Sequence, residues 1–590
     1  MPPQSHWVDG YGPVRYGWRA EGDYTFYRRI GIVEGLFDTD GVDCEGRADL
    51  SMHLHLNLKT RLSPQKLRAH ILLAWSVMRQ KHVLLSTRVM DGADLNHALS
   101  SGDVVKGERL QDNDAKDRFF VFKPCRQPGS MLTEAAQHAV FVEDHSSRVD
   151  VKEFFIHTQN TRRCINPEQA MSKLYILPVT ESQLHLVFIA AHQIVDGLTS
   201  SRWMASFIHL LNLSRQQLES ETEALCSSTP LTRFPPAQEA LYPLIKGSEA
   251  RQRWSWLLSR ILRHTRRSNP AAFQNPLRRT DHLSRAAALN PKFPGVLDYS
   301  RLPPQNTFPL TAVLSPASTR RISRICRDAK ISVGSGCFAL VAIVMMLFEE
   351  KRNPQIPLHE RLPFVGSFPI NPRPFLSGEP TTGKEDSLML AFSDGITLPF
   401  LSSDLSLKGR IRLLGKMAHR QLRQYQKRPR SKEEQIQMGS RSPTQLIPLL
   451  YLNTMEYLER KSQPERKRGW NIQGAYPAAV SPTMSTCGVS SVGARGSVLR
   501  KGMYDTSTEL PEHVDVVADF RGQDSRVRAR EGEFLVGVIG DDVLRFGVSY
   551  DGCAIDPALA EQWKDVMERI LEEPGIQEAA RQDERSAHKL

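Results

Sequence analysis

Residues 190–198 read AAHQIVDGL and separate two apolar segments of different periodicity. The segment before them, 184–190, has the apolar composition of a buried strand. The segment after them, 199–211, carries apolar residues at helical spacing. The sequence therefore predicts a strand, a short turn and a helix in this order.

Three residues of this turn are candidates for a functional site. His192 follows the strand directly, so its ring can face a cavity at the strand's end. Asp196 can fold back to fix the loop, and Gly197 permits a sharp turn into the helix. On geometry alone, the simpler interpretation is a loop histidine whose hydrogen bonds are satisfied locally.

Strands and helices alternate in the same style elsewhere in the chain. In the first half, 51–59 alternates apolar and polar residues as a half-buried strand does, and 63–81 has the spacing of a helix. In the second half we expect helices at 318–328, 337–348 and 557–571, a strand at 543–550, and short strands near Phe364, Val489 and Val536. The predicted class is therefore α/β or α+β.

The chain of 590 residues has a charged fraction of 24% and a hydrophobic fraction of 40%, as globular proteins do. Pro-rich stretches divide it into a first lobe at 1–225, a Pro-rich and basic crossover at 226–310, and a second lobe at 311–590. The longest apolar run, 337–348, is too short to cross a bilayer. The first residues lack a secretory signal, so we expect an intracellular, cytoplasmic protein.

Eight cysteines lie far apart, without a Cys-x-x-Cys pair, and are expected to be reduced thiols. His53 and His55 share one face of a predicted strand, and such a pair binds zinc when a third ligand converges on it. The sequence shows no third ligand, which favours ordinary strand histidines. We therefore predict no metal site.

The net charge of +12 is concentrated in two segments. Residues 251–280 hold eight arginines and residues 405–432 hold ten basic residues, both without an acid, so the remainder of the chain is acidic. This distribution argues against a nucleic-acid binder. Both segments also have apolar residues at helical spacing, which predicts two surface helices with solvated arginine-rich faces. A phosphate-attracting mouth or attachment to a membrane surface stays an alternative.

The pattern His192-x-x-x-Asp196-Gly197 between a strand and a helix resembles the signature of the coenzyme A-dependent acyltransferase superfamily. That superfamily includes chloramphenicol acetyltransferase, plant BAHD acyltransferases and peptide-synthetase condensation domains. Residues 67–89 look like its first helix and the strand after it, and 545–557 look like its last strand and helix. Further segments resemble fungal secondary-metabolite O-acyltransferases of the trichothecene 15-O-acetyltransferase type: 235–243, 253–256, 366–371 and 488–493.

The resemblance implies two chloramphenicol-acetyltransferase-like lobes with a tunnel between them, and His192 as the general base. It places an arginine of the second lobe, here Arg373, against Asp196. It also suggests Ser490 or Ser491 as a donor to the oxyanion or the substrate. Acyl-CoA is implied as co-substrate rather than bound cofactor, although the sequence assigns no residue to it. The implied reaction transfers an acyl group, most simply acetyl, to a terpenoid or polyketide hydroxyl.

Some residues depart from the patterns of the superfamily. Ala191 stands where condensation domains usually carry a first histidine, and the BAHD Asp-Phe-Gly-Trp-Gly motif is absent. A condensation-like enzyme that takes its acyl group from a carrier protein is the alternative enzyme, and a degenerate scaffold without activity is the alternative outside enzymes. We expect a monomer without nucleic-acid partners. The last residues, 587–590, resemble a peroxisomal address only faintly.

Overall fold

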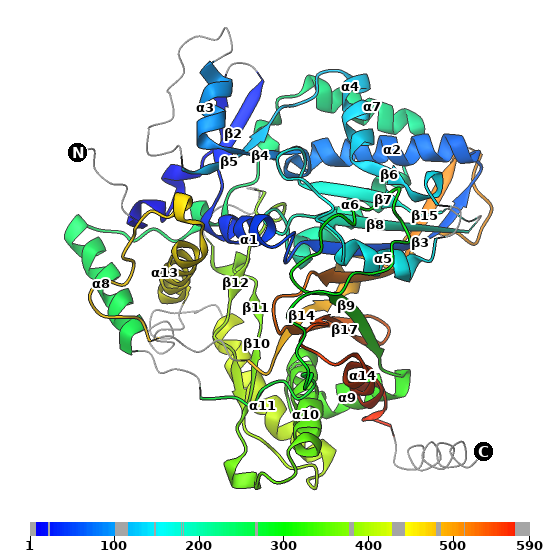
Figure 1. Cartoon of the computed structure of the whole chain (residues 1–590). Coiled ribbons are helices and arrows are strands. Elements are labelled where there is room, and N and C mark those ends of the chain that lie inside the picture. The colour runs from blue at the N-terminus through cyan, green and yellow to red at the C-terminus, as the bar shows by residue number, and fades with distance from the viewer. Residues whose placement is uncertain are drawn as a thin grey trace.

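The computed structural model describes residues 7–21, 24–100, 116–146, 149–178, 180, 182–265, 270–376, 383–426, 443–479, 485–512 and 514–572. Two α/β lobes, each built on a mixed sheet, lie one above the other in Figure 1. A smaller sheet and a group of helices flank them. The predicted class, α/β or α+β in two lobes, is confirmed.

The first lobe is built on a five-stranded sheet. Its order is β15 (Val516–Val527), β3 (Leu50–Thr60), β8 (Gln183–Ala190), β7 (Ser172–Ile176) and β6 (Ala139–Phe141). Helix α2 (Pro64–Lys81) packs against α4 (Pro128–Gln137), α6 (Gly197–Leu211) and α7 (Arg215–Ser227). Helix α5 (Val151–Gln159) contacts β3. The strand and helix predicted at 51–59 and 63–81 are thus confirmed.

The second lobe is built on a six-stranded sheet. Its order is β13 (Ile396–Leu398), β10 (Phe364–Ser367), β14 (Cys487–Ala494), β16 (Phe534–Gly540), β17 (Leu544–Asp551) and β9 (Thr307–Val313). Four helices pack with it: α9 (Pro316–Asp328), α10 (Val333–Arg352), α11 (Leu407–Gln426) and α14 (Pro557–Arg569).

Helix α10 forms the centre of this lobe. It is the one helix in the described part of the chain that is long and apolar enough to cross a bilayer, but 78% of its most apolar window is buried inside the protein. Burial of this kind is what a core helix requires, because a helix that is apolar on all sides needs protein around it.

Strand β15 links the C-terminal part of the chain to the sheet of the first lobe. The strand belongs to the C-terminal part of the chain, yet it pairs antiparallel with β3 in the first lobe, from Val516 opposite Thr60 to Val527 opposite Leu50. Val516, Ala518 and Phe520 are buried in the first lobe's core. The range 311–590 therefore does not coincide with the second sheet, and β15 covers an edge of the first sheet that would otherwise be open.

A four-stranded sheet that the sequence did not predict flanks the first lobe. Its order is β1 (Arg19–Glu21), β2 (Thr25–Arg29), β5 (Arg118–Phe122) and β4 (Arg88–Asp91), and α3 (Gly92–Ser100) contacts it. Helix α1 (Ile32–Asp43) packs on α13 (Pro443–Lys461), as does α8 (Glu249–Thr265). Two short strands, β11 (Pro369–Ile370) and β12 (Ala391–Phe392), pair between these parts.

The two basic segments do form helices, but they differ in which face is buried. On α11, Ile411, Leu414 and Ala418 face the core, as predicted for a surface helix. On α8, Trp254 and Leu257 are exposed while Arg263 is buried. The expectation of an arginine-rich solvated face therefore holds for α8 only in part: Arg251 and Arg253 are exposed, whereas Arg260 and Arg263 bond to the segment beneath the helix.

Candidate active site

His192 lies in the turn between β8 and α6, as the sequence predicted. The backbone N–H of Ala191 donates to the carbonyl of Met171 (2.9 Å), and that of Ile194 donates to the carbonyl of Ala191 (3.1 Å). These bonds hold the turn at the end of the sheet. The imidazole stacks face to face on Phe37 of α1, with ring centroids 4.1 Å apart and planes within 6°.

The electrostatics of the turn favour a neutral His192. Burial lowers the pKa of its imidazole, because the charged form loses hydration there. The carboxylate of Asp196 acts in the opposite direction, and the guanidinium of Arg530 lowers the pKa further. A neutral imidazole is the form that can accept a proton.

His192 faces a cavity of about 340 Å³ whose walls come from both lobes. This volume lies at the lower end of the range of small-molecule sites. Segment 525–530, at and beyond the end of β15, forms one side of it, and Phe37 and Phe392 contribute aromatic surface. The other wall comes from the second sheet, with Cys487, Ser490, Phe534, Gly537 and Gly547, and from Phe368, which follows β10.

The structure separates the two candidate serines of β14. Ser490 lines the cavity that His192 faces. Ser491 is exposed, and its hydroxyl lies near Gly334 at the start of α10. Successive residues of a strand point to opposite faces, so only one of the two can face the cavity. Of the two serines, Ser490 is therefore the one on the face of β14 toward the cavity.

Asp196 uses both carboxylate oxygens away from the His192 ring. Its Oδ1 accepts hydrogen bonds from the backbone N–H groups of Leu198 (2.9 Å) and Thr199 (3.0 Å), which caps helix α6. Its Oδ2 accepts from Arg373 Nη2 at 2.6 Å and from the backbone N–H of Met389 at 3.0 Å. Asp196 therefore acts on His192 through its charge and through the shape of the turn.

Arg373, in the second half of the chain, bonds to the turn at His192 through Asp196. The side chains of Arg373 and Asp196 are only 4% and 6% exposed. Arg373 Nη2 also donates to Thr199 Oγ1 and to the carbonyl of Ser387 (both 2.8 Å), and its Nε donates to the carbonyl of Lys384 at 3.0 Å. The pair expected from the resemblance is thus present, with its buried charges well satisfied.

Gly197 does not act as a turn residue. It is the first residue of α6 and does not adopt the left-handed conformation that favours glycine. A Cβ atom built there meets nothing within 4 Å, and the residue lines the cavity. The prediction that this position needs the backbone freedom of glycine is therefore wrong. The glycine instead leaves room beside His192.

Three arginines near the cavity escaped the sequence analysis, as did Phe37, because none belongs to a motif. Arg526 Nη2 donates to Thr311 Oγ1, and Arg528 Nη2 donates to the carbonyl of Thr158 at 2.8 Å. Arg530 Nη2 donates to Asp40 Oδ2 at 2.8 Å. None of the described residues of the basic segments 251–280 and 405–432 lines the cavity, which leaves their suggested role as a phosphate mouth untested.

The predicted histidine pair meets a third histidine across the sheet. His185 of β8 lies opposite His55 of β3, and its Nδ1 is 3.0 Å from His53 Nε2. The rings of His55 and His185 stack with centroids 4.2 Å apart instead of converging on one point. Among the described residues, no group of three histidines, cysteines or acids is arranged to hold a metal ion.

Comparison with solved structures defines the class of fold: the chain has the two-lobed fold of a solved acetyltransferase. Trichothecene 15-O-acetyltransferase from Fusarium sporotrichioides has the same fold, with a TM-score of 0.62 over 97% of this chain and 99% of that chain, at 11% identity. The first condensation domain of the calcium-dependent antibiotic synthetase matches with a TM-score of 0.49 over 95% and 98% of the two chains, at 10% identity.

The fold resemblance found in the sequence is therefore confirmed. No protein-family model matches the sequence, and no curated protein matches it significantly. At 11% sequence identity, the structural likeness shows the fold but not the substrate, the acyl donor or the roles of individual residues.

Proposed function

We propose that the protein is an acyltransferase that moves an acyl group, most simply acetyl, from acyl-CoA to a hydroxyl of a small molecule. The observation that carries the proposal is His192: a neutral imidazole, stacked on Phe37, that faces a cavity with walls from both lobes. A neutral imidazole in such a place can act as a general base toward a bound hydroxyl.

In the proposed reaction, His192 takes the proton of the acceptor hydroxyl as its oxygen attacks the thioester carbonyl carbon. The new carbon–oxygen bond converts the carbonyl oxygen to an oxyanion, which needs a hydrogen-bond donor. Ser490 is the donor we assign, because its strand faces the cavity. The tetrahedral intermediate then collapses, the carbon–sulfur bond breaks, and protonated His192 returns the proton to the leaving thiolate.

The acceptor is a compact apolar molecule with few polar groups. Phe37, Phe368, Phe392 and Phe534 line the cavity and suit rings or branched hydrocarbon. The likeness to trichothecene 15-O-acetyltransferase supports a terpenoid acceptor, and a polyketide hydroxyl fits the same chemistry. We place the reaction in secondary metabolism of a fungus, in the cytoplasm, and propose that the enzyme works as a monomer.

The test of the donor uses the purified protein with a mixture of small metabolites as acceptors. Acetyl-CoA and an acetylated carrier protein are supplied in separate reactions, and mass spectrometry follows products that gain an acetyl group. We expect products with acetyl-CoA. Products formed only from the carrier protein would instead show a condensation-like enzyme, and no product from either donor would contradict acyl transfer.

A further inference from the structure

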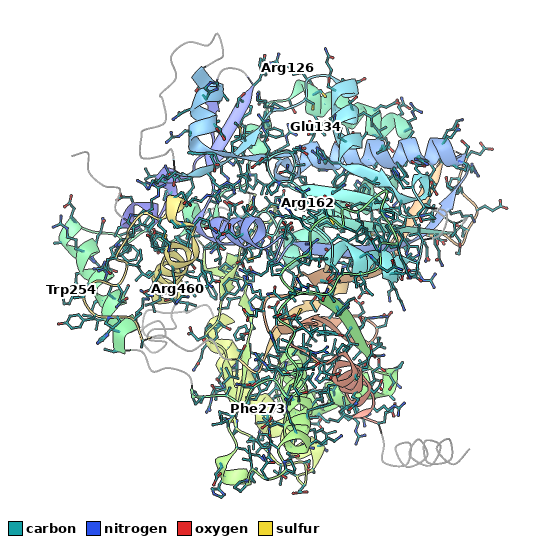
Figure 2. The ribbon with its side chains drawn as sticks, viewed as in Figure 1. Arg126, Glu134, Arg162, Trp254, Phe273 and Arg460 are labelled. Atoms are coloured by element: carbon teal, nitrogen blue, oxygen red, sulfur yellow. The ribbon has the colours of Figure 1, made fainter. Side chains whose placement is uncertain are left out.

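Helix α8 turns an apolar stripe toward solvent. Trp254, Leu257, Leu258 and Ile261 are 57%, 45%, 42% and 43% exposed. Their spacing of three, four and seven residues places them on one face of the helix. Figure 2 shows Trp254 at the outer edge of the molecule, on the helix that projects beside α13. Large apolar side chains gathered on one exposed face mark an interaction surface.

The opposite face of α8 is fixed to the protein, so the helix cannot rotate to bury this stripe. Trp256 is buried, and its ring packs edge-on against Trp7 with centroids 5.3 Å apart. Arg263 pairs with Glu456 and donates to Asn453 Oδ1 (2.9 Å) and Gln473 Oε1 (2.7 Å). These contacts make the outward direction of the stripe a property of the folded protein.

The charge around the stripe is strongly positive. Among the described residues 246–265, Lys246, Arg251 and Arg253 are exposed basic residues, and Glu249 is the single acid. Arg251 and Arg253 are exposed in the first turns of α8, and the pair of Arg253 with Glu249 is too exposed to bind strongly. A helix with tryptophan and leucine on one face and arginines beside them is suited to the boundary between lipid headgroups and acyl chains.

We propose that α8 docks the protein on an anionic lipid surface. Trp254, Leu257, Leu258 and Ile261 enter the headgroup region, and Arg251 and Arg253 contact headgroup phosphates. The positive charge selects this occupant, because a purely apolar partner groove leaves the arginines without counterions, whereas an anionic membrane supplies many. The proposal is independent of the acyl-transfer reaction, since the described residues of α8 do not line the cavity at His192.

The chain supplies a matched control on its other basic helix. Leu413 of α11 is 50% exposed, close to the exposure of Leu257 and Leu258, and it also lies among basic residues. The apolar stripe of α11 is buried in the second lobe, however, so this leucine stands apart from such a patch. A charge at Leu413 therefore repeats the chemistry of a charge on α8 without touching the proposed surface.

The experiment measures co-sedimentation of the full chain with vesicles of phosphatidylcholine alone or with added phosphatidylserine. We expect binding to the phosphatidylserine vesicles that weakens with salt. The variant Leu257→Asp/Leu258→Asp should lose at least about tenfold in affinity, since two leucines leave the lipid. Leu413→Asp should bind like the unchanged protein, and all three proteins should have the same circular dichroism spectrum and acyl-transfer rate.

Three results would overturn the proposal. One is the absence of binding to phosphatidylserine vesicles, and another is equal binding by the Leu257→Asp/Leu258→Asp variant. The third is a dimer of the unchanged protein in sedimentation equilibrium that this variant dissociates, because a second copy would then cover the stripe.

Discussion

At the residue scale, Asp196 and Arg373 join the turn at His192 to a segment of the second half of the chain. Removal of one member of a buried ion pair leaves the other charge without a partner, which typically costs about 3–5 kcal/mol. We expect Asp196→Ala and Arg373→Ala each to lower the free energy of unfolding by such an amount, measured by urea denaturation. The double variant should lose less than the sum of the single variants. Additive losses would show that the pair does not act as a unit.

Gly197 gives a prediction in which stability and activity move apart. Its backbone conformation suits any residue and its Cβ direction is open, so Gly197→Ala should leave stability unchanged or raise it by up to about 1 kcal/mol. A larger side chain, as in Gly197→Leu, enters the cavity and should raise KM for the acceptor. Thermal unfolding and steady-state kinetics measure the two effects. If Gly197→Ala lowered the stability, the backbone at this position would need glycine after all.

In the proposed mechanism, the protonation of His192 sets the acidic limb of the pH profile. Its pKa is lowered from the ordinary value of 6.5, so the neutral base persists below that pH. We expect kcat/KM to fall only as the pH drops through this lowered value, because protonation removes the base. Arg530 lowers this pKa through its charge, so Arg530→Gln should move the limb to higher pH. A limb above 6.5 in the unchanged enzyme would contradict this assignment.

At the scale of elements, a carboxyl group with a raised pKa packs against the start of α1 from the short helix Gln238–Leu241. Glu239 is fully buried, and Oε1 accepts a hydrogen bond from the backbone N–H of Val33 at 2.9 Å. Burial, and secondarily the nearby Glu34 carboxylate, raise the pKa of Glu239 to about 7 from 4.5. The folded protein therefore favours the protonated carboxyl.

The consequence is a loss of stability as pH rises. The contribution of Glu239 to the free energy of unfolding is fully present below pH 4.5. It is lost as pH rises through about 7, because the folded protein then contains a buried negative charge. Glu239→Gln is uncharged at every pH and should raise the free energy of unfolding at pH 8 by roughly 2–3 kcal/mol relative to the unchanged protein. The control Glu249→Gln, at an exposed position, should change little. If the free energy of unfolding of Glu239→Gln depended on pH as that of the unchanged protein does, the Glu239 carboxyl would not be the source of this dependence.

Periodicity predicted most of the central elements but not their surroundings. It identified β3, α2, β8, α6 and α10, because each has a continuous pattern that its neighbours bury. It misjudged α8, since spacing finds an apolar stripe but not the direction in which the stripe faces. That direction is set by Trp256 and Arg263, whose partners Trp7 and Glu456 are distant in sequence.

At the scale of the whole molecule, the site is an assembly of distant segments. The turn at His192 and its partner Arg373 were predictable, because a family pattern marks both. Phe37 was not, since stacking on His192 requires α1 to lie beside β8 and no local signal indicates that. The pairing of β15 with β3 of the first lobe was equally unpredictable, because it depends on an open edge of a sheet formed by distant residues.

The central claim is that His192 is the general base for acyl transfer, and His192→Ala tests it most directly. The measurement is turnover of the purified variant with acetyl-CoA and an accepted hydroxyl substrate, beside the control His359→Ala, whose histidine side chain is 80% exposed. We predict that His192→Ala loses roughly 10²- to 10⁴-fold in turnover while its fold and its binding of acetyl-CoA persist, and that the control is unchanged. Turnover of His192→Ala close to that of the unchanged enzyme would contradict the mechanism.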